Sequence, residues 1–238
     1  MKNVLVIGAS GDIGRAIVQA LAQENYQFIL HYHQNKQAME NLLKDIETSK
    51  VLQVIQADLT KDNGANNLYE QIVYAVHAVI YVSGLTEHRL FSEVDEQTMD
   101  RMLTLHVKSP WLITQKLLPS MIKRHSGKVI FITSIWGSSG ASNEVIYSSV
   151  KGAQNSFVKA LAKEVGPSGV SVNAVSPGFI DTKMNRHIQA EERQTIISQI
   201  PANRIGLPDE IAHAVQFLMD EKSNYILGEI IQISGGWH

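Results

Sequence analysis

Residues 4–14 read V-L-V-I-G-A-S-G-D-I-G, and this stretch decides the fold. Four aliphatic residues that run directly into glycine are typical of a buried strand ending in a tight turn. Beyond the turn, Ile17, Val18 and Leu21 recur at the spacing of one helix face. A strand, a glycine turn and a helix in this order predict the first unit of a parallel sheet covered by helices.

The same alternation continues along the chain, and its short apolar runs predict seven strands, at residues 4–7, 28–32, 51–55, 78–82, 128–133, 170–175 and 230–233. Segments of helical period lie at residues 13–24, 36–47, 61–75, 98–124, 147–165 and 208–219. Strands without polar alternation are typical of a sheet that helices cover on both faces. We expect an α/β fold, a single-domain Rossmann doubly wound fold over residues 1–238 with a seven-stranded parallel sheet. The polar stretch at about 179–204 is expected to form a substrate lid.

Composition and charge narrow the classes of function. A formal charge of −2 provides no basic field for nucleic acid, and the nine histidines show no metal-ligand spacing, so we expect neither a nucleic-acid partner nor a metal. The absence of cysteine excludes disulfides, thiol nucleophiles and cysteine-ligated zinc. No stretch approaches the roughly 20 apolar residues of a membrane span, and the N-terminus does not read as a signal peptide. We expect a cytoplasmic protein with no membrane partner.

The glycine turn after the first strand is a candidate nucleotide site. Glycines let backbone N–H groups and a helix N-terminus approach a pyrophosphate. An ordinary strand-to-helix turn uses glycine as well, so the pattern by itself does not establish binding. Its position after the first strand favours a dinucleotide. The candidate cofactor-binding residues of the turn are Gly8, Ser10, Gly11, Asp12, Ile13 and Gly14.

The end of the second strand bears on the choice of dinucleotide. Residues 31–36 read H-Y-H-Q-N-K and lack the Asp or Glu that would bind the ribose 2′-hydroxyl of NAD. His31, His33 and Lys36 could instead attract a 2′-phosphate, so NADP(H) is favoured over NAD(H). The alternative is that these residues are only the solvated start of a helix.

The third strand is followed by A-D-L, with Asp58 and Leu59 as further candidate cofactor contacts. The Asp58 carboxylate could accept a hydrogen bond from an adenine amino group. An Asp at a strand end also commonly caps the next helix, and both interpretations stay open.

Ser134, Tyr147 and Lys151 are the candidate catalytic residues. Tyr147 and Lys151 lie four residues apart on one helix face, so the ammonium can lower the pKa of the phenol and also reach a cofactor ribose. Ser134 ends the apolar run K-V-I-F-I-T, which places it at the carboxyl edge of the sheet, where such folds bind ligands. The three groups indicate hydride transfer to a carbonyl. A surface tyrosine beside a solvated lysine is the alternative, and Tyr32 with Lys36 repeats the spacing without an upstream hydroxyl.

Six segments in order make the chain resemble the short-chain dehydrogenase/reductase family, particularly its 3-oxoacyl-acyl-carrier-protein reductase branch, over nearly the full length. They are the glycine turn at 8–14, Ser134, Tyr147-x-x-x-Lys151, V-N-A-V-S-P-G-F-I-D-T at 172–182, R-I-G-L-P-D-E-I-A from Arg204, and the ending I-S-G-G-W. The resemblance implies that Tyr147 donates a proton, Ser134 positions the carbonyl and Lys151 binds the ribose. It also implies that a segment with Pro177, Gly178, Ile180 and Thr182 lies against the nicotinamide.

The chain departs from that family pattern at three places. Asp12 stands where the family has glycine, which puts an acidic group near the expected pyrophosphate unless its carboxylate turns away to cap the helix. Tyr81-Val82-Ser83-Gly84 replaces Asn-Asn-Ala-Gly after the fourth strand, with Ser83 and Gly84 expected to keep the backbone course beside the cofactor. His106 stands where the family places a catalytic Asn. It could titrate near neutral pH and relay protons, or be a packed helix residue.

The resemblance implies a ketone reductase whose substrate is a small molecule or is linked to a carrier protein. An acidic carrier would need a basic rim, for which Lys123, Arg124 and Lys128 are candidates, unless they are merely solvated charges. The chain also resembles elongation factor P 5-aminopentanone reductases, which reduce a ketone on a modified lysine of a translation factor. A non-catalytic dinucleotide-sensing regulator is an alternative of another class. The resemblance further implies a homotetramer or homodimer through the helices at 98–124 and 147–165 and the C-terminal strand.

Overall fold

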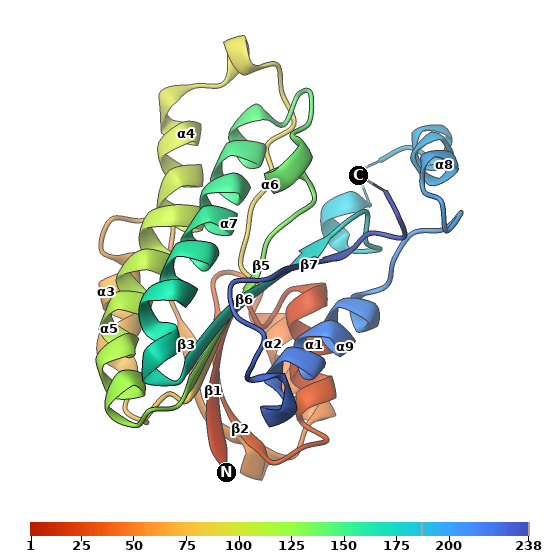
Figure 1. The fold of residues 1–238 in the computed structure, drawn as a ribbon. Helices are drawn as coiled ribbons and strands as arrows, with labels where there is room; N and C mark the ends of the chain where they lie inside the picture. Colours follow the sequence, from red (N-terminus) through yellow and green to blue (C-terminus); the bar gives the residue numbers. More distant parts are fainter. Residues whose placement is uncertain (187, 238) are drawn as a thin grey trace.

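The computed structural model describes residues 1–186 and 188–237. Seven parallel strands form one sheet in the order β3-β2-β1-β4-β5-β6-β7, which confirms the predicted fold (Figure 1). The strands are β1 (Lys2–Ile7), β2 (Tyr26–Tyr32), β3 (Val51–Gln56), β4 (Ala78–Tyr81), β5 (Gly127–Ile132), β6 (Val170–Pro177) and β7 (Ile230–Ile233). The strand order reverses between β1 and β4, and open α/β sheets bind ligands outside the carboxyl ends of the strands at such a point.

Helices cover both faces of the sheet. One face carries α1 (Asp12–Leu21), α2 (Lys36–Asp45) and α9 (Pro208–Met219), and the other carries α3 (Gly64–Gln71), α5 (Ser109–Lys123) and α7 (Val145–Val165). Smaller or peripheral helices are α4 (Glu96–Leu103), α6 (Trp136–Ser139) and α8 (Ala190–Gln199). None of the helices in the described residues is both long and apolar enough to cross a membrane.

The residues of β1 show why the sheet is covered on two faces. Val4 and Val6 pack with Ile17 and Val18 of α1, whereas Leu5 and Ile7 pack into the core on the opposite face. All of these side chains are fully buried. Burial of one such side chain contributes about 1.5–3 kcal/mol, so the strands form a rigid frame that holds the loops at their carboxyl ends.

The predicted helix at 98–124 is interrupted by a π-helical turn at Thr104–Lys108, between α4 and α5. Pro110 gives the physical reason, because its nitrogen has no hydrogen to donate to the carbonyl of His106 four residues earlier. Gln154 of α7 supplies the missing donor, with Nε2 2.8 Å from His106 O. Single π-helical turns inside α-helices are frequent at functional sites, and this one holds His106.

The stretch predicted as a lid contains a 3₁₀ turn at Lys183–Asn185 and then α8. No residue of α8 is buried, and in Figure 1 the helix stands away from the main body. Ile180 and Gly206 form a parallel bridge at the base of the stretch. A segment anchored at its base with an exposed helix at its tip has the form of a lid, and that role stays a prediction.

Candidate active site

Three side chains meet where β5 ends and α7 begins. Ser134 lies two residues after the end of β5, and Tyr147 and Lys151 lie one turn apart near the start of α7. The ammonium of Lys151 is 5.6 Å from the centre of the Tyr147 ring. The Ser134 hydroxyl accepts from Trp136 N at 3.2 Å and is near enough to Tyr147 to lower the pKa of the phenol. The structure therefore brings the predicted hydroxyl, phenol and ammonium together at the carboxyl edge of the sheet.

Burial controls the protonation of Tyr147. Burial raises its pKa to about 12, the polar contact with Ser134 lowers the pKa in part, and the negative charge of Glu144 raises it. The net pKa of the phenol is therefore raised and not lowered, because loss of solvent outweighs the favourable contacts. The phenol consequently keeps its proton at neutral pH and is available as a proton donor.

Lys151 is fully enclosed, and burial lowers its pKa to about 7. Its Nζ donates to Ile132 O, at the end of β5, over 2.9 Å. An ammonium group has three N–H donors, so this bond leaves donors for a ribose hydroxyl. The bond to Ile132 therefore fixes Lys151 beside Tyr147 and leaves other N–H groups of the ammonium for a ligand.

His106 lies beside the phenol but does not behave as a neutral-pH titrating group. Its ring meets the Tyr147 ring edge-on with centres 5.9 Å apart, and Nε2 lies 3.1 Å from Leu85 N and 3.0 Å from Leu85 O. Burial, and next the charge of Lys151, lower its pKa to about 3. The hypothesis of titration near neutral pH is therefore wrong here, and any part His106 has in proton transfer is played by the neutral imidazole.

Gln154 is a site residue that the sequence analysis missed. Tyr147, Lys151 and Gln154 lie on one face of α7, since they are separated by four and then three residues. Gln154 donates to the carbonyl of His106, and its own Oε1 is buried with no partner among the described residues. Two features of the sequence indicate Gln154. It lies seven residues after Tyr147, on the same helix face, and Pro110 leaves the carbonyl of His106 in need of a donor.

The glycine turn fits a dinucleotide pyrophosphate. Gly8 has a φ of +92°, and a Cβ there would lie 2.6 Å from Ser83 N, so the turn packs closely on the backbone after β4. Ser83 N donates to Ile7 O over 2.9 Å, which keeps Ser83 and Gly84 beside the turn as predicted. The first N–H groups of α1 have no partner within the helix and can bind an anion.

The Asp12 carboxylate leaves the glycine turn for a distant segment. Ser10 precedes Gly11, and Asp12 and Ile13 are the first two residues of α1. Asp12 does not cap α1, because its Oδ2 accepts a hydrogen bond from Lys183 N at 2.6 Å, across to the 3₁₀ turn after β6. The predicted acidic group near the pyrophosphate is present, and its carboxylate turns toward the segment after β6.

His31 is a structural residue, contrary to the expectation that it could attract a phosphate. It is buried, it accepts from Gly8 N at 3.2 Å, and its Nε2 lies 3.0 Å from Ala57 O. Burial lowers its pKa to about 4, so the ring is neutral and braces the turn. Lys36 is exposed and pairs with Glu40 at 3.7 Å.

His33 and Asp58 lie together at the ends of β2 and β3. His33 Nε2 is 3.5 Å from Asp58 Oδ2, while Asp58 Oδ1 accepts from Thr60 N and Thr60 Oγ1. Burial alone raises the pKa of Asp58, but the two bonds from Thr60 outweigh it and leave the pKa below its usual value. Asp58 therefore caps the next turn, and its second oxygen remains directed toward His33. Leu59 is buried, with its carbonyl accepting from Ser109.

The segment after β6 reaches the same edge of the sheet. Ile135 N donates to Pro177 O and Gly178 N donates to Ile233 O, each over 3.0 Å. Thr182 is buried directly before the 3₁₀ turn, and Ile180 pairs with Gly206. The segment predicted to face a nicotinamide is consequently fixed against the loop that carries Ser134.

A family model described as enoyl-(acyl carrier protein) reductase matches residues 8–238. An uncharacterized oxidoreductase of Bacillus subtilis, YmfI, is 44% identical over 239 residues, which span 100% of this chain and 99% of that protein. The 3-oxoacyl-[acyl-carrier-protein] reductase FabG of Staphylococcus epidermidis is 32% identical over 241 residues, with 100% of this chain and 99% of that protein covered. The chain belongs to the short-chain dehydrogenase/reductase family.

A solved structure agrees with this membership. A putative NAD(P)-dependent gluconate 5-dehydrogenase from Beutenbergia cavernae, solved with bound NADP at low occupancy, superposes with a TM-score of 0.92 at 26% identity. The likeness covers 99% of this chain and 96% of the other. As a short-chain dehydrogenase/reductase, the protein is an oxidoreductase with a fold that holds a nicotinamide dinucleotide.

This short-chain dehydrogenase/reductase also has an aromatic wall that the sequence analysis missed, formed by Trp136, Phe179 and Trp237. The rings of Trp136 and Trp237 are 4.9 Å apart, and those of Phe179 and Trp237 are 6.5 Å apart, both edge-on. Trp136 follows Ser134 by two residues and Phe179 follows Pro177 by two. The sequence ending I-S-G-G-W could have indicated this wall, because its tryptophan, Trp237, packs against the loops that carry Trp136 and Phe179.

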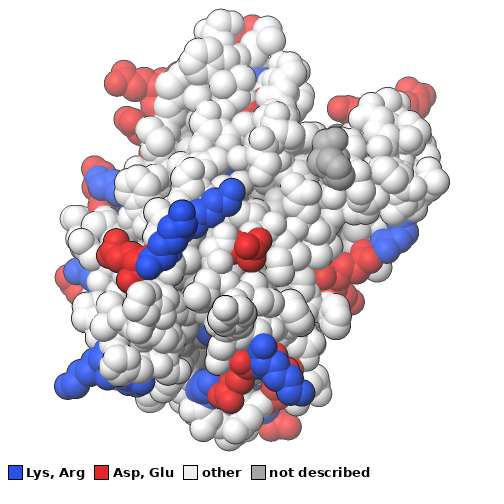
Figure 2. Space-filling model, in the orientation of Figure 1, with Lys and Arg blue, Asp and Glu red and all other residues white. Residues whose placement is uncertain are grey.

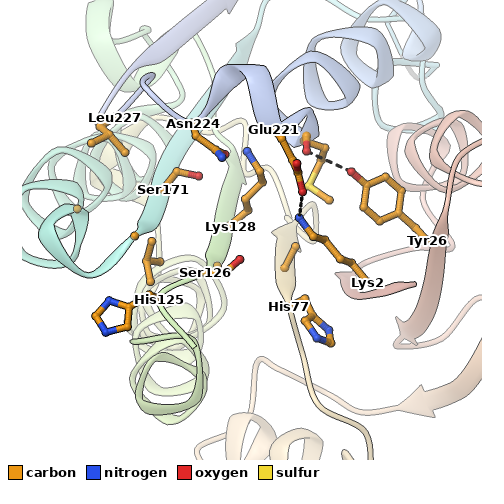
Figure 3. Close-up of a pocket in the computed structure, with 16 residues that line it drawn as sticks. Lys2, Tyr26, His77, His125, Ser126, Lys128, Ser171, Glu221, Asn224 and Leu227 are labelled. Atoms are coloured by element: carbon orange, nitrogen blue, oxygen red, sulfur yellow. Dashed lines mark hydrogen bonds and ion pairs between the residues drawn. The ribbon is translucent and has the colours of Figure 1, made fainter. Parts of the chain in front are cut away.

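The predicted basic rim lies on the wrong edge of this short-chain dehydrogenase/reductase. Lys123 ends α5, Arg124 follows it, and Lys128 is the second residue of β5, so all three lie at the amino edge of the sheet. Ser134 follows the opposite end of β5. Lys128 lines a cavity of about 330 Å³ there (Figure 3). On the face shown in Figure 2, basic and acidic groups lie beside one another on a largely uncharged surface. The three residues cannot line the mouth of the candidate active site.

Proposed function

We propose that the protein is an NAD(P)H-dependent ketone reductase in which Tyr147 donates the proton. The observation that carries this proposal is a buried, protonated phenol beside the Lys151 ammonium and the Ser134 hydroxyl. A reduced nicotinamide, when bound, supplies a hydride. Ser134 binds the carbonyl oxygen, and Tyr147 Oη gives its proton as that oxygen becomes an alkoxide. An alkoxide is far more basic than a phenolate, so a phenol with a raised pKa can still protonate it.

Lys151 has two tasks in this proposal. Its ammonium lies near the ring of Tyr147 and stabilises the phenolate that remains after proton transfer. Its other N–H groups bind the cofactor ribose, while Ile132 O fixes the side chain. The proton then returns to Tyr147 through groups near Lys151, where the neutral His106 of the π-helical turn and Gln154 of α7 lie.

For the substrate we propose first a 3-oxoacyl group on a carrier protein. The similarity to a 3-oxoacyl-[acyl-carrier-protein] reductase over the whole chain supports this choice. The aromatic wall of Trp136, Phe179 and Trp237 offers apolar surface to an acyl chain. The carrier would have to dock on groups other than Lys123, Arg124 and Lys128.

Reduction of a 5-aminopentanone on elongation factor P is the second candidate, and Glu144 favours it. Glu144 lies three residues before Tyr147, raises the pKa of the phenol through its charge, and accepts a hydrogen bond from Thr86 at 2.9 Å. A carboxylate at this place suits a substrate that carries an ammonium group better than a neutral acyl chain. The chain is 44% identical to the oxidoreductase YmfI, which is not named as a carrier-protein reductase, and 32% identical to FabG. This difference in identity supports the second candidate.

One experiment tests the proposal and separates the two substrates. Oxidation of NADPH is followed by absorbance with acetoacetyl carrier protein or with 5-aminopentanone-modified elongation factor P. The proposal expects turnover of one of them, and loss of that turnover in Tyr147→Phe. Glu144→Gln should weaken use of the aminopentanone and leave the acyl substrate unaffected. Tight NADPH binding without turnover of either substrate, or of a wider ketone panel, would support the non-catalytic dinucleotide-sensing regulator instead.

NADPH is proposed as the cofactor, since the end of β2 has no acidic residue and His33 is available for a 2′-phosphate. The neighbouring Asp58 carboxylate, 3.5 Å from His33, keeps that ring oriented. Replacing His33 with Asp should lower the NADPH-to-NADH ratio of kcat/KM about tenfold, by repelling the phosphate. An unchanged ratio would remove His33 from the assignment.

Assembly into a homotetramer or homodimer in the cytoplasm completes the proposal. Trp111 of α5 is 47% exposed and its ring lies 5.9 Å from that of Phe157 on α7. Leu103, in the last turn of α4, is 50% exposed. Exposed apolar groups along these helices support a helix-on-helix interface. Trp111→Glu should therefore reduce the molar mass measured by light scattering.

A further inference from the structure

Asp12 joins two segments that lie 171 residues apart in the chain, the glycine turn and the segment after β6, between which the dinucleotide is expected. Asp12 stands in the first turn of α1, beside the glycine turn, and its Oδ2 accepts from Lys183 N over 2.6 Å. Lys183 begins the 3₁₀ turn that follows Thr182, the last residue expected to face the nicotinamide. The bond therefore spans the two walls between which the cofactor would lie.

Physical chemistry explains why this bond forms. The first N–H groups of a helical turn have no partner inside it, so Lys183 N needs an outside acceptor. A carboxylate is the strongest such acceptor, and its position at the N-terminus of α1 is also favoured by the helix dipole. Glycine at position 12, which the family resemblance leads one to expect, would leave Lys183 N without this partner.

We propose that Asp12 is a latch that holds the segment after β6 over the dinucleotide and slows the release of the cofactor. This inference rests on the proposed use of NADPH. The latch makes a prediction opposite to that of simple charge repulsion. If Asp12 acted only by repelling the pyrophosphate, its removal would tighten binding and slow release. If it acts as a latch, its removal frees the 3₁₀ turn, and the cofactor leaves faster.

Both partners of the bond can be removed separately. Asp12→Ala removes the acceptor, and Asp12→Asn removes the charge while it retains an oxygen acceptor. Lys183→Pro removes the donor, and the backbone accommodates it, because Thr182 is extended at φ −131° and ψ 164° and proline is favoured at the first position of a helical turn. Lys183→Ala retains the donor and is the matched control for loss of the side chain.

The test is stopped-flow fluorescence of NADPH release from the full chain, with hydrogen exchange at the Lys183 amide as a second readout. We expect Asp12→Ala and Lys183→Pro each to speed release about tenfold, as for loss of a bond to a charged group. The double variant should be no faster than either single variant, and Asp12→Asn should be slower than Asp12→Ala. Lys183→Ala should match the wild type. Exchange at Lys183 should speed up in Asp12→Ala.

The outcomes separate the latch from the proposed function. Slower or unchanged release in Asp12→Ala, or equal release in Lys183→Ala and Lys183→Pro, would overturn the latch while NADPH binding still stands. Absence of NADPH binding in the wild type would overturn the proposed cofactor. In that case Asp12 cannot act by slowing cofactor release, even if exchange at Lys183 shows that the bond exists. Should Lys183→Pro fail to fold, Asp12→Ala and the exchange measurement decide the question.

Discussion

Two buried lysines lie at opposite ends of strand β5, and they differ in their hydrogen-bond partners. Lys128 belongs to the strand, and Lys151 comes from α7. Lys128, at the amino end, donates to Leu218 O at 2.9 Å and to Asp220 O at 3.1 Å, and so caps the C-terminus of α9. Lys151, of α7, donates to Ile132 O at the carboxyl end of the strand. Burial lowers the pKa of Lys128 to about 8 and that of Lys151 to about 7.

The neighbours of the two lysines separate a structural role, for Lys128, from the catalytic role proposed for Lys151. The cavity of about 330 Å³ lies beside Lys128, at the edge where Tyr26 also donates to Met219 O (Figure 3). The proposed chemistry lies at the other edge, where Lys151 has a phenol beside it and donates to Ile132 O. A cavity and a perturbed pKa therefore do not identify the site, whereas the side chains within reach of the lysine do.

The largest effect is expected for Tyr147→Phe, which removes the proton donor and leaves the ring. Turnover of the ketone substrate should fall on the order of a hundredfold or more. Tyr32→Phe is the matched control, because Tyr32 also precedes a lysine by four residues but bonds to Gln56 at the end of β3. Steady-state NADPH oxidation measures both variants, and equal turnover in the two would contradict the assignment.

The comparison of the two lysines predicts changes of opposite sign. Lys151→Met should reduce turnover about a hundredfold, yet raise the free energy of unfolding by on the order of 2 kcal/mol, since a buried amine is no longer desolvated. Lys128→Met should leave turnover unchanged and destabilise the fold by about 1–3 kcal/mol, because Leu218 O and Asp220 O lose their donor. Urea unfolding and NADPH oxidation test the pair. Equal changes in turnover and in the free energy of unfolding for the two variants would contradict the different roles of the two lysines.

The pH dependence follows from the lowered pKa of Lys151. Its ammonium, which supports Tyr147, is lost as the pH rises through about 7, so turnover in the reductive direction should decline above that value. Between about 7 and the usual 10.5 the unfolded chain binds more protons than the folded one, so the free energy of unfolding rises with pH. The stability gain of Lys151→Met should therefore shrink from pH 7 to pH 10. A gain that stays constant would contradict the assigned pKa.

A smaller effect is expected at His106. His106→Asn keeps a neutral hydrogen-bonding group at the π-helical turn and should change turnover less than His106→Ala, which should lower it about tenfold. Neither variant should remove a pH transition near 6.5, because burial keeps the imidazole neutral. Turnover and the pH–rate profile are the measurements. Unchanged turnover in His106→Ala would exclude His106 from the proton path.

The sequence was sufficient for the sheet and for the grouping of Ser134, Tyr147 and Lys151, because apolar runs and strand ends are local signals. It was insufficient for His31 and Asp12, whose partners come from distant segments that no pattern links. The position of Lys128 was misjudged, although its place at the start of a strand already assigned it to the amino edge. The π-helical turn was also missed, even though Pro110 lies four residues after His106.

The most direct test of the account is a single-turnover measurement of NADPH oxidation by the protein with its ketone substrate, in H₂O and in D₂O. The account predicts that wild-type protein shows a solvent isotope effect, because a proton moves from the Tyr147 phenol as the carbonyl is reduced. It also predicts that Tyr147→Phe is at least about a hundredfold slower. Equal rates for the wild type and Tyr147→Phe, with the same isotope effect in both, would contradict it.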